Sequence, residues 1–207
     1  MRISELQREE NWNEFLRLLQ NDDYLEVTRD ETSGGVSAVH KLHKLDKQMG
    51  PYGVRRGDYE MMVIKVLRGL GHRIVLEAEP SSGEKKCDGL LDDVPIEIKA
   101  IEARGEWAIS TKLLKAERQH AQCVALYFPR EDLFSIDRVV DGIGKYSANP
   151  ELKEELNINQ ILAITEDGLL GVWDKKATPI EGWSVWEGFR RQNGANPFTI
   201  SPSDAKV

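Results

Sequence analysis

The segment 87–100 constrains the fold of this chain more than any other part of the sequence. It holds an isolated Asp88, two further aspartates typical of a tight turn, and then Glu97 and Lys99 inside an apolar run. Side chains alternate between the two faces of a strand, so Glu97 and Lys99 point one way while the isoleucines beside them point into the core. A charged group among core residues is costly unless it is paired or binds a metal ion. The segment therefore predicts a β-hairpin whose charged side chains are paired or bind a metal ion.

A regular order of elements surrounds this hairpin. Helical periodicity places Asp58 as the cap of a first helix and Gly71 at its end. The expected elements are a helix over 58–70, strands over 73–78, 86–91 and 94–101, a helix over 111–120 and a strand over 122–128. Short turns join successive strands antiparallel, whereas the strand after the second helix can lie parallel. This order predicts an α/β fold with a mixed β-sheet flanked by helices.

The flanking regions carry weaker patterns. Near the N-terminus, Trp12, Phe15, Leu16 and Leu19 recur at helical spacing and predict an amphipathic helix over 3–20. The other expected elements are a strand over 24–28, a short basic helix over 36–49, a helix over 136–146, a hairpin over 158–173 and a packed cap that includes Trp183, Trp186 and Phe189. We expect an N-terminal helical extension (1–50), a core that contains the hairpin (51–130) and a C-terminal extension packed on it (131–207).

Bulk composition excludes several classes of protein. The chain has 207 residues and a net charge of −7, and no apolar run approaches the ~20 residues of a membrane span. The first residues carry no apolar segment, so we expect no membrane association and a cytoplasmic location. Cys87 and Cys123 do not form a cluster with zinc-site spacing, and we expect two buried, reduced thiols. The acidic balance argues mildly against a nonspecific nucleic-acid binder, but an acidic protein can still contain a basic groove.

The residues of the hairpin suit phosphodiester hydrolysis. Pairing about the turn brings Asp88 near the Glu97 end, so two carboxylates and Lys99 converge. A divalent cation such as Mg²⁺ is held by one or two carboxylates together with waters and a phosphate oxygen. The backbone carbonyl of Ile98 would be a further ligand, and Lys99 would stabilise developing negative charge. We therefore expect Mg²⁺ or another divalent cation as cofactor and nucleic acid as partner.

This arrangement resembles the PD-(D/E)xK nuclease superfamily, whose restriction-endonuclease-like core has the same order of helix, three strands, helix and strand. The resemblance implies that Asp88 and Glu97 are the metal carboxylates and that Lys99 is the catalytic lysine. Glu60 matches a glutamate found on the first helix in this superfamily. For the polar residue of the second helix, Gln119, Lys112 and Lys115 are candidates.

Within the superfamily, residues 57–128 look most like the nuclease domains of contact-dependent growth inhibition toxins. The similar residues include Gly57-Asp58-Tyr59-Glu60 and Glu97-Ile98-Lys99. Members of that group cleave tRNA, so the resemblance implies an RNA substrate and, for a toxin, an immunity protein that covers the site. The oligomeric state stays open.

Other interpretations of the same residues stay open. DNA is the close alternative substrate, and a second class of function is a non-catalytic module that binds nucleic acid or protein on a nuclease scaffold. Asp88, Glu97 and Lys99 would then form ion pairs on a half-exposed strand. Lys85, Lys112 and Lys115 would contact substrate phosphates or simply be solvated. Trp107 would stack on a base, although a buried Trp is more frequent, and surface or packing roles are expected for His40 and His43.

Overall fold

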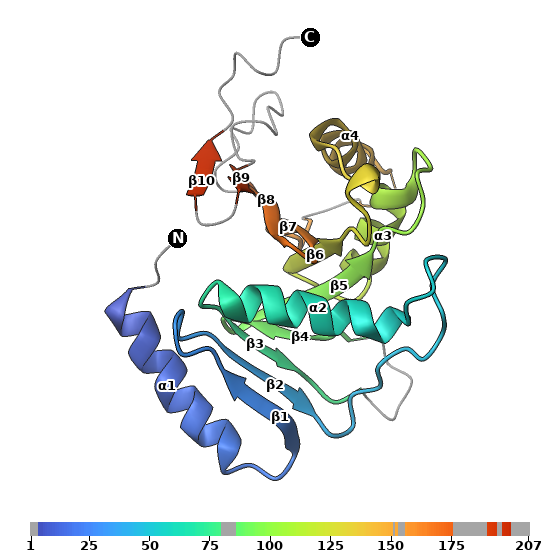
Figure 1. The fold of residues 1–207 in the computed structure, drawn as a ribbon. Helices are drawn as coiled ribbons and strands as arrows, with labels where there is room; N and C mark the ends of the chain where they lie inside the picture. Colours follow the sequence, from blue (N-terminus) through green and yellow to red (C-terminus); the bar gives the residue numbers. More distant parts are fainter. Residues whose placement is uncertain are drawn as a thin grey trace. The chain divides into compact units, whose positions relative to one another are not determined.

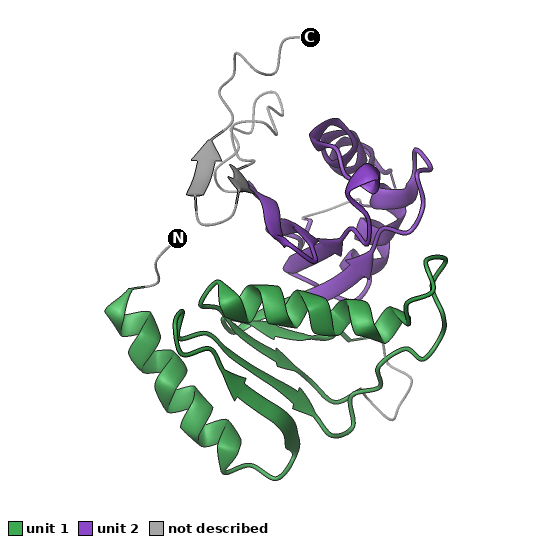
Figure 2. Cartoon of the chain, viewed as in Figure 1, with its two compact units in different colours: residues 1–96 green, residues 97–207 purple. Residues whose placement is uncertain are grey.

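The computed structural model describes residues 4–79, 86–150, 152 and 156–175, and the backbone of two strands over 190–193 and 196–199. The chain forms two compact units, residues 1–96 and 97–207 (Figure 2). The boundary between these units differs from the expected boundaries near residues 50 and 130. The expected division into a core and two extensions stays a prediction. No helix among the described residues is long and apolar enough to cross a membrane.

Unit 1 is built on strands of mixed direction, which Figure 1 shows together with the helices of this unit. Its elements are α1 (Glu5–Leu19), β1 (Tyr24–Arg29), β2 (Val36–His40), α2 (Arg56–Gly69), β3 (Arg73–Leu76), β4 (Gly89–Leu91) and the first residues of β5 (Val94–Ala100). The pairs β1–β2, β3–β4 and β4–β5 are antiparallel, and β2–β3 is parallel. The expected strands over 24–28, 73–78 and 94–101 and the helices over 3–20 and 58–70 are confirmed, with shifted ends.

The two helices of unit 1 cover opposite faces of its strands. Leu18 of α1 packs in a buried cluster with Val36 and Ala38 of β2. Ser37 lies between them and therefore points to the other face. Its hydroxyl accepts a hydrogen bond of 3.0 Å from Arg68 of α2, which shows that α2 covers that face. Strands covered on both sides form the centre of this unit.

The basic helix expected over 36–49 is wrong, because this segment begins with strand β2. Val36, Ser37 and Ala38 are all buried, as a strand between two helices requires. A short apolar run that is buried on both faces has no alternating pattern, so its periodicity does not separate a strand from a helix. The N-terminal region is therefore not purely helical.

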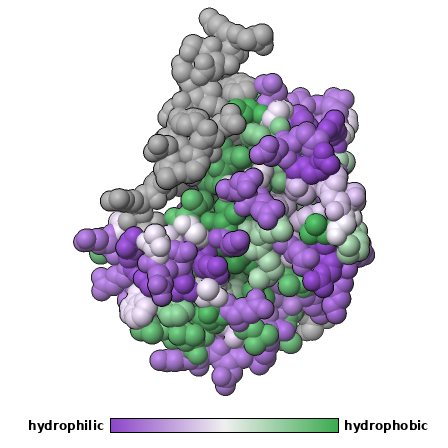
Figure 3. Space-filling view, viewed as in Figure 1, coloured by the Kyte–Doolittle hydropathy of each residue, from purple (hydrophilic) through white to green (hydrophobic). Residues whose placement is uncertain are grey.

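The apolar face expected for α1 is also only partly right. Trp12, Leu16 and Leu19 are exposed. Figure 3 shows hydrophobic surface among hydrophilic surface on the face in view. The buried residues of the helix are Leu18 and Asn11 instead. The Asn11 amide donates hydrogen bonds to the carbonyls of Gly34 (3.1 Å) and Gly71 (2.9 Å), so a polar residue anchors the helix where apolar periodicity points elsewhere.

The hairpin between β4 and β5 turns at Asp92 and Asp93, as expected. Both residues have positive φ angles, 47° and 69°, which a two-residue turn of the mirror-image type requires. The Asp92 carboxylate accepts hydrogen bonds from His72 Nδ1 (2.7 Å) and from the Arg73 amide (2.8 Å). Burial acts to raise the pKa of Asp92, but these hydrogen bonds and the charges of both partners hold the pKa below its ordinary value. The aspartates therefore serve the turn.

The ends of α2 follow the sequence only in part. Gly71 has a φ of 97° just after the helix, in the left-handed conformation expected at a helix end. The expected cap at Asp58 is wrong, because the helix starts after Arg55 and Asp58 lies in its first turn. The first amides of α2 are bonded instead to the preceding loop: Arg56 donates to the Gln48 carbonyl and Gly57 to the Asp46 carbonyl.

Unit 2 continues the α/β pattern. Its elements after β5 are α3 (Ala108–Glu117), β6 (Cys123–Tyr127), a 3₁₀ turn η1 (Glu131–Leu133), α4 (Ile136–Ser147), β7 (Gln160–Thr165), β8 (Gly168–Asp174), β9 (Arg190–Asn193) and β10 (Asn196–Thr199). β6 and β7 are parallel, whereas β7–β8, β8–β9 and β9–β10 are antiparallel. The expected hairpin over 158–173 and both expected helices are confirmed. Trp183, Trp186 and Phe189 lie outside the described residues.

The order α2, β3, β4, β5, α3, β6 is thus the one expected from the sequence. The fold is α/β with mixed strand directions, and the part of the chain that the structure describes contains four α-helices. In unit 2, Gly142 of α4 allows the close approach of α3, since a Cβ there would lie 2.6 Å from the Ile109 side chain.

Candidate active site

The Glu97–Lys99 pair of β5 is the centre of the candidate site. Lys99 Nζ donates a short hydrogen bond to Glu97 Oε1. The Glu97 side chain is 1% exposed and that of Lys99 is 18% exposed. The pair is therefore not an ion pair on a half-exposed strand, which was the alternative to a metal site. Both side chains come from one face of the strand, as the i, i+2 spacing requires. The structure therefore places a buried carboxylate and an ammonium where the sequence predicted them.

The remaining β5 residues explain why the strand holds this position. Ile96 is fully buried and Ile98 is 7% exposed, and both point away from the Glu97 side of the strand. Ile101 directly follows the last residue of β5, and its amide donates a hydrogen bond to the Tyr127 carbonyl of β6 (2.8 Å). Burial of the isoleucines and this backbone bond fix the strand from one side, and the charged residues occupy the other.

A second pair of titratable residues lies in unit 1, and the sequence did not predict it. His43 Nε2 lies 3.0 Å from Glu60 Oε2, and His43 Nδ1 lies 2.9 Å from the Glu77 carbonyl oxygen. The His43 side chain is almost fully buried. The expected surface or packing role for His43 is therefore wrong, whereas His40 does pack, edge-on against the Tyr24 ring at 5.3 Å.

The surroundings of His43 favour its charged form. A carbonyl oxygen and a carboxylate both accept hydrogen bonds, so both ring nitrogens must donate, which only the imidazolium does. Burial acts to lower the pKa of His43, but the hydrogen bonds to Glu60 and Glu77 and the charges of Glu60 and Asp88 raise it above its ordinary value. Glu60, the predicted helix glutamate, is thus held by a buried cation.

Asp88 lies just before β4 and is half-buried. Its carbonyl accepts a hydrogen bond of 3.0 Å from the Glu77 amide, and its charge acts on His43. Unit 1 therefore brings Asp88, Glu60 and His43 into one electrostatic neighbourhood. The β4–β5 register pairs Gly89 with Ile96. Asp88 is the residue before Gly89, and Glu97 is the residue after Ile96.

The other predicted site residues lie at varied places. Gln119 is half-buried but follows α3, which ends at Glu117, so it is not on the second helix. Lys115 is exposed in the last turn of that helix, and Lys112 is half-buried near its start. Lys85 lies outside the described residues. Their roles stay predictions.

Trp107 is exposed, and the buried packing expected for it is wrong. Its side chain is 60% exposed, with Lys145 Nζ 4.9 Å from the ring centroid. It lines a surface depression of about 440 Å³ together with Ile101 and Lys112, just after β5 in the chain. An exposed indole beside a cation is a surface on which a nucleobase can stack. Neither Cys87 nor Cys123 forms a disulfide; Cys123 is buried, as expected, whereas Cys87 is only half-buried.

A buried carboxylate with several hydrogen-bond donors, Glu117, was not predicted from the sequence. It accepts hydrogen bonds from the Tyr146 hydroxyl, the Asn157 amide (2.8 Å) and Asn157 Nδ2 (2.7 Å). Burial, and then the Glu117 carboxylate, raise the pKa of Tyr146 far above its ordinary value. The residues come from three separate segments, so no sequence spacing could signal this network.

The donors present suit a hard cation held by few protein ligands. Among the described residues, no group of three or more His, Cys, Asp or Glu side chains is arranged to hold a metal ion. Mg²⁺ is usually bound by one or two carboxylates together with waters and substrate oxygens. Ligation by Asp88, Glu97 and the Ile98 carbonyl therefore stays a prediction. Comparison with protein-family models, with curated proteins and with solved structures found no match for this chain. The resemblance to the PD-(D/E)xK nucleases therefore rests on the residues and the order of elements alone.

Proposed function

We propose that this protein is a divalent-metal-dependent nuclease of the PD-(D/E)xK type. The observation that carries the proposal is the buried Glu97–Lys99 pair on an apolar strand of a hairpin that follows helix α2. Burying a carboxylate and an ammonium is unfavourable compared with apolar residues of the same size. A role in chemistry explains why such a pair occupies this strand.

The proposed roles of these residues are those that the resemblance to the PD-(D/E)xK nucleases implies. Asp88, Glu97 and the Ile98 carbonyl would hold Mg²⁺ or a similar cation, which when bound supplies charge stabilisation and a water of lowered pKa. The Lys99 ammonium stabilises negative charge that develops on the phosphate. Glu60 orients the attacking water or a cation ligand, and His43 fixes the Glu60 carboxylate through its 3.0 Å contact.

We favour RNA as substrate, with tRNA first, because of the resemblance to the growth-inhibition toxins. The exposed Trp107 supports a strand with accessible bases, since an indole stacks on unpaired bases more readily than on a duplex. DNA is the alternative substrate. A toxin role would add an immunity protein as partner.

The test compares cleavage of tRNA and of plasmid DNA, in Mg²⁺ and in EDTA. We expect Mg²⁺-dependent cleavage, reduced at least about 100-fold in Glu97→Gln and in Lys99→Ala, the magnitude typical of lost electrostatic stabilisation. Glu166→Gln, in the exposed turn between β7 and β8, and Lys65→Ala, exposed on α2, are matched controls and should cleave like the wild type. Nucleic-acid binding without cleavage, unchanged by EDTA, would instead favour the non-catalytic module.

A further inference from the structure

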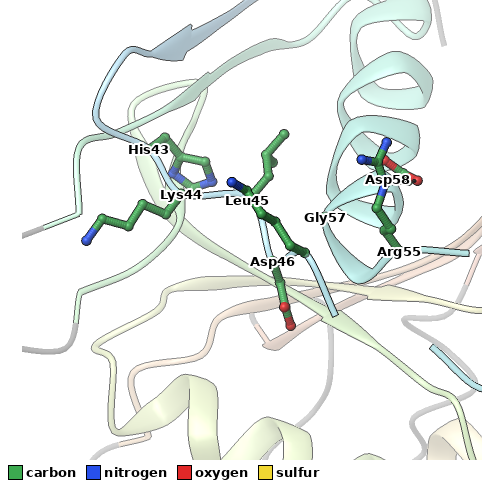
Figure 4. A pocket seen from close by; sticks show the side chains of 8 residues that line it. His43, Lys44, Leu45, Asp46, Arg55, Gly57 and Asp58 are labelled. Carbon is green, nitrogen blue, oxygen red and sulfur yellow. Dashed lines mark hydrogen bonds and ion pairs between the residues drawn. The ribbon is translucent and has the colours of Figure 1, made fainter. Parts of the chain in front are cut away.

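A cavity of about 610 Å³ opens in unit 1 beside the buried His43 (Figure 4). Its lining combines the loop after β2 with the start of α2. The lining cations are His43, Lys44, Lys47 and Arg55, and the lining acids are Asp46 and Asp58. The lysines and the arginine outnumber the acids even without the charge of His43. The cavity is therefore locally basic on a protein whose net charge is −7.

The wall of this cavity is held in place by close packing. A Cβ on Gly57 would lie 2.7 Å from Leu45 Cβ, so only glycine allows the loop to lie this close to α2. The Gly57 amide donates to the Asp46 carbonyl at 2.8 Å, and the Arg56 amide to the Gln48 carbonyl at 2.9 Å. These bonds use the amides at the start of the helix. An anion in the cavity would therefore be bound by side chains and not by the helix N-terminus.

The lysines and the arginine that line the cavity are accessible, whereas the His43 side chain is buried. The side chain of Lys44 is 79% exposed and that of Arg55 is 61% exposed. Figure 4 shows Arg55 beside Asp58 at the start of α2, with Lys44 extending on the other side of Leu45. The Arg55–Asp58 contact of 3.3 Å is an exposed ion pair and is readily exchanged for a phosphate.

The cavity also leads to the predicted catalytic machinery of unit 1. His43 forms part of its lining, and the same ring contacts the Glu60 carboxylate. A phosphate chain in the cavity would therefore pass directly beside the residue that holds Glu60. We infer that this cavity binds the phosphodiester backbone of a nucleic-acid strand through Lys44, Lys47 and Arg55; this inference rests on the nuclease function proposed above and assigns a substrate subsite to it.

Binding without cleavage tests this inference. The probe is a fluorescently labelled single-stranded RNA oligonucleotide, and its affinity is measured by anisotropy over a range of salt concentrations, in EDTA and in Ca²⁺. The test variant is Lys44→Gln/Lys47→Gln/Arg55→Gln. The matched control, Arg17→Gln/Lys41→Gln/Lys65→Gln, removes the same charge from cations of unit 1 that do not line the cavity. Circular dichroism checks that both variants are folded.

We expect the cavity variant to bind at least about tenfold more weakly and to reduce the slope of log affinity against log salt by about 2, as loss of three phosphate contacts on a single strand predicts. The control should retain the wild-type slope. Equal weakening in both variants, an unchanged slope, or a wild type that binds no RNA in either buffer would overturn the inference.

The outcome is separable from that of the nuclease test. If the wild type cleaves in Mg²⁺ but the cavity variant keeps its affinity, the subsite is wrong and the nuclease function stands. If the wild type never cleaves but binds through the cavity, the subsite stands and the catalytic function is wrong.

Discussion

Two buried glutamates of unit 2, Glu117 and Glu97, have very different partners. Glu117 accepts hydrogen bonds from Tyr146 of α4 and from the backbone and side chain of Asn157. Its carboxylate thus joins α3, α4 and the segment before β7. Glu97 instead forms an ion pair with Lys99, two residues further along the same strand. That ion pair joins no separate elements of the fold.

This difference distinguishes a buried charge that stabilises the fold from a buried charge with a role in chemistry. A carboxylate with several donors from distant segments offsets its desolvation with hydrogen bonds that fix tertiary structure. An ion pair inside one strand fixes little tertiary structure, yet it concentrates opposite charges at one point of a sheet. Glu117 therefore suits a stabilising role, and the catalytic role proposed for Glu97 stays a prediction.

Removal of Glu117 is the strongest way to test this contrast. Glu117→Ala leaves the Tyr146 hydroxyl and the Asn157 donors without their acceptor, so the free energy of unfolding should fall by about 3 kcal/mol. Urea denaturation measures the change. Cleavage per folded molecule should not change at temperatures well below the transition. Loss of cleavage in a variant of normal stability would reverse the assignment.

Tyr146→Phe makes a smaller change in the same network. It removes one hydrogen bond to Glu117 and leaves both Asn157 donors in place. The free energy of unfolding should fall by about 1 kcal/mol. Thermal unfolding of this variant beside the wild type and Glu117→Ala gives the comparison. A decrease as large as that of Glu117→Ala would mean that Tyr146 carries the network.

Replacement of the whole β5 pair should have the smallest effect on stability. Glu97→Gln/Lys99→Met removes both charges together, so neither is left buried alone, and the free energy of unfolding should stay within about 1 kcal/mol of the wild type. Metal-dependent cleavage should nevertheless be lost. A loss of several kcal/mol, measured by the same urea denaturation, would show that the pair holds the fold.

A pH titration extends the comparison to the His43–Glu60 pair of unit 1. The pKa of folded His43 is raised above its ordinary value of 6.5, so its contribution to stability is complete below that pH. The contribution is lost as the pH rises through the folded pKa. Stability of the wild type should therefore fall, as the pH rises above 6.5, by more than that of His43→Gln. Identical pH profiles of the two proteins would contradict an imidazolium at this position.

The hairpin and the alternation of its side chains were predictable because they depend on neighbours in the chain. Two aspartates suit the positive φ angles of the β4–β5 turn, and the period of two along β5 sets which faces Glu97 and Lys99 share. The same local rules predicted α2, α3, α4 and the β7–β8 hairpin. They failed at β2, where a strand buried on both faces loses its alternating pattern.

The sequence alone determined the order of elements and the charged pair on β5, because both follow from short-range geometry. Only the tertiary structure decided that Asn11 and not Trp12 anchors α1, that His43 holds Glu60 from 17 residues away, and that Glu117 meets Asn157 from 40 residues away. The physical reason is that such contacts depend on how loops close and how helices pack. Neither can be predicted from the spacing of residues in the sequence. The basic cavity beside His43 belongs to this second group, since two segments brought together by Gly57 form its lining.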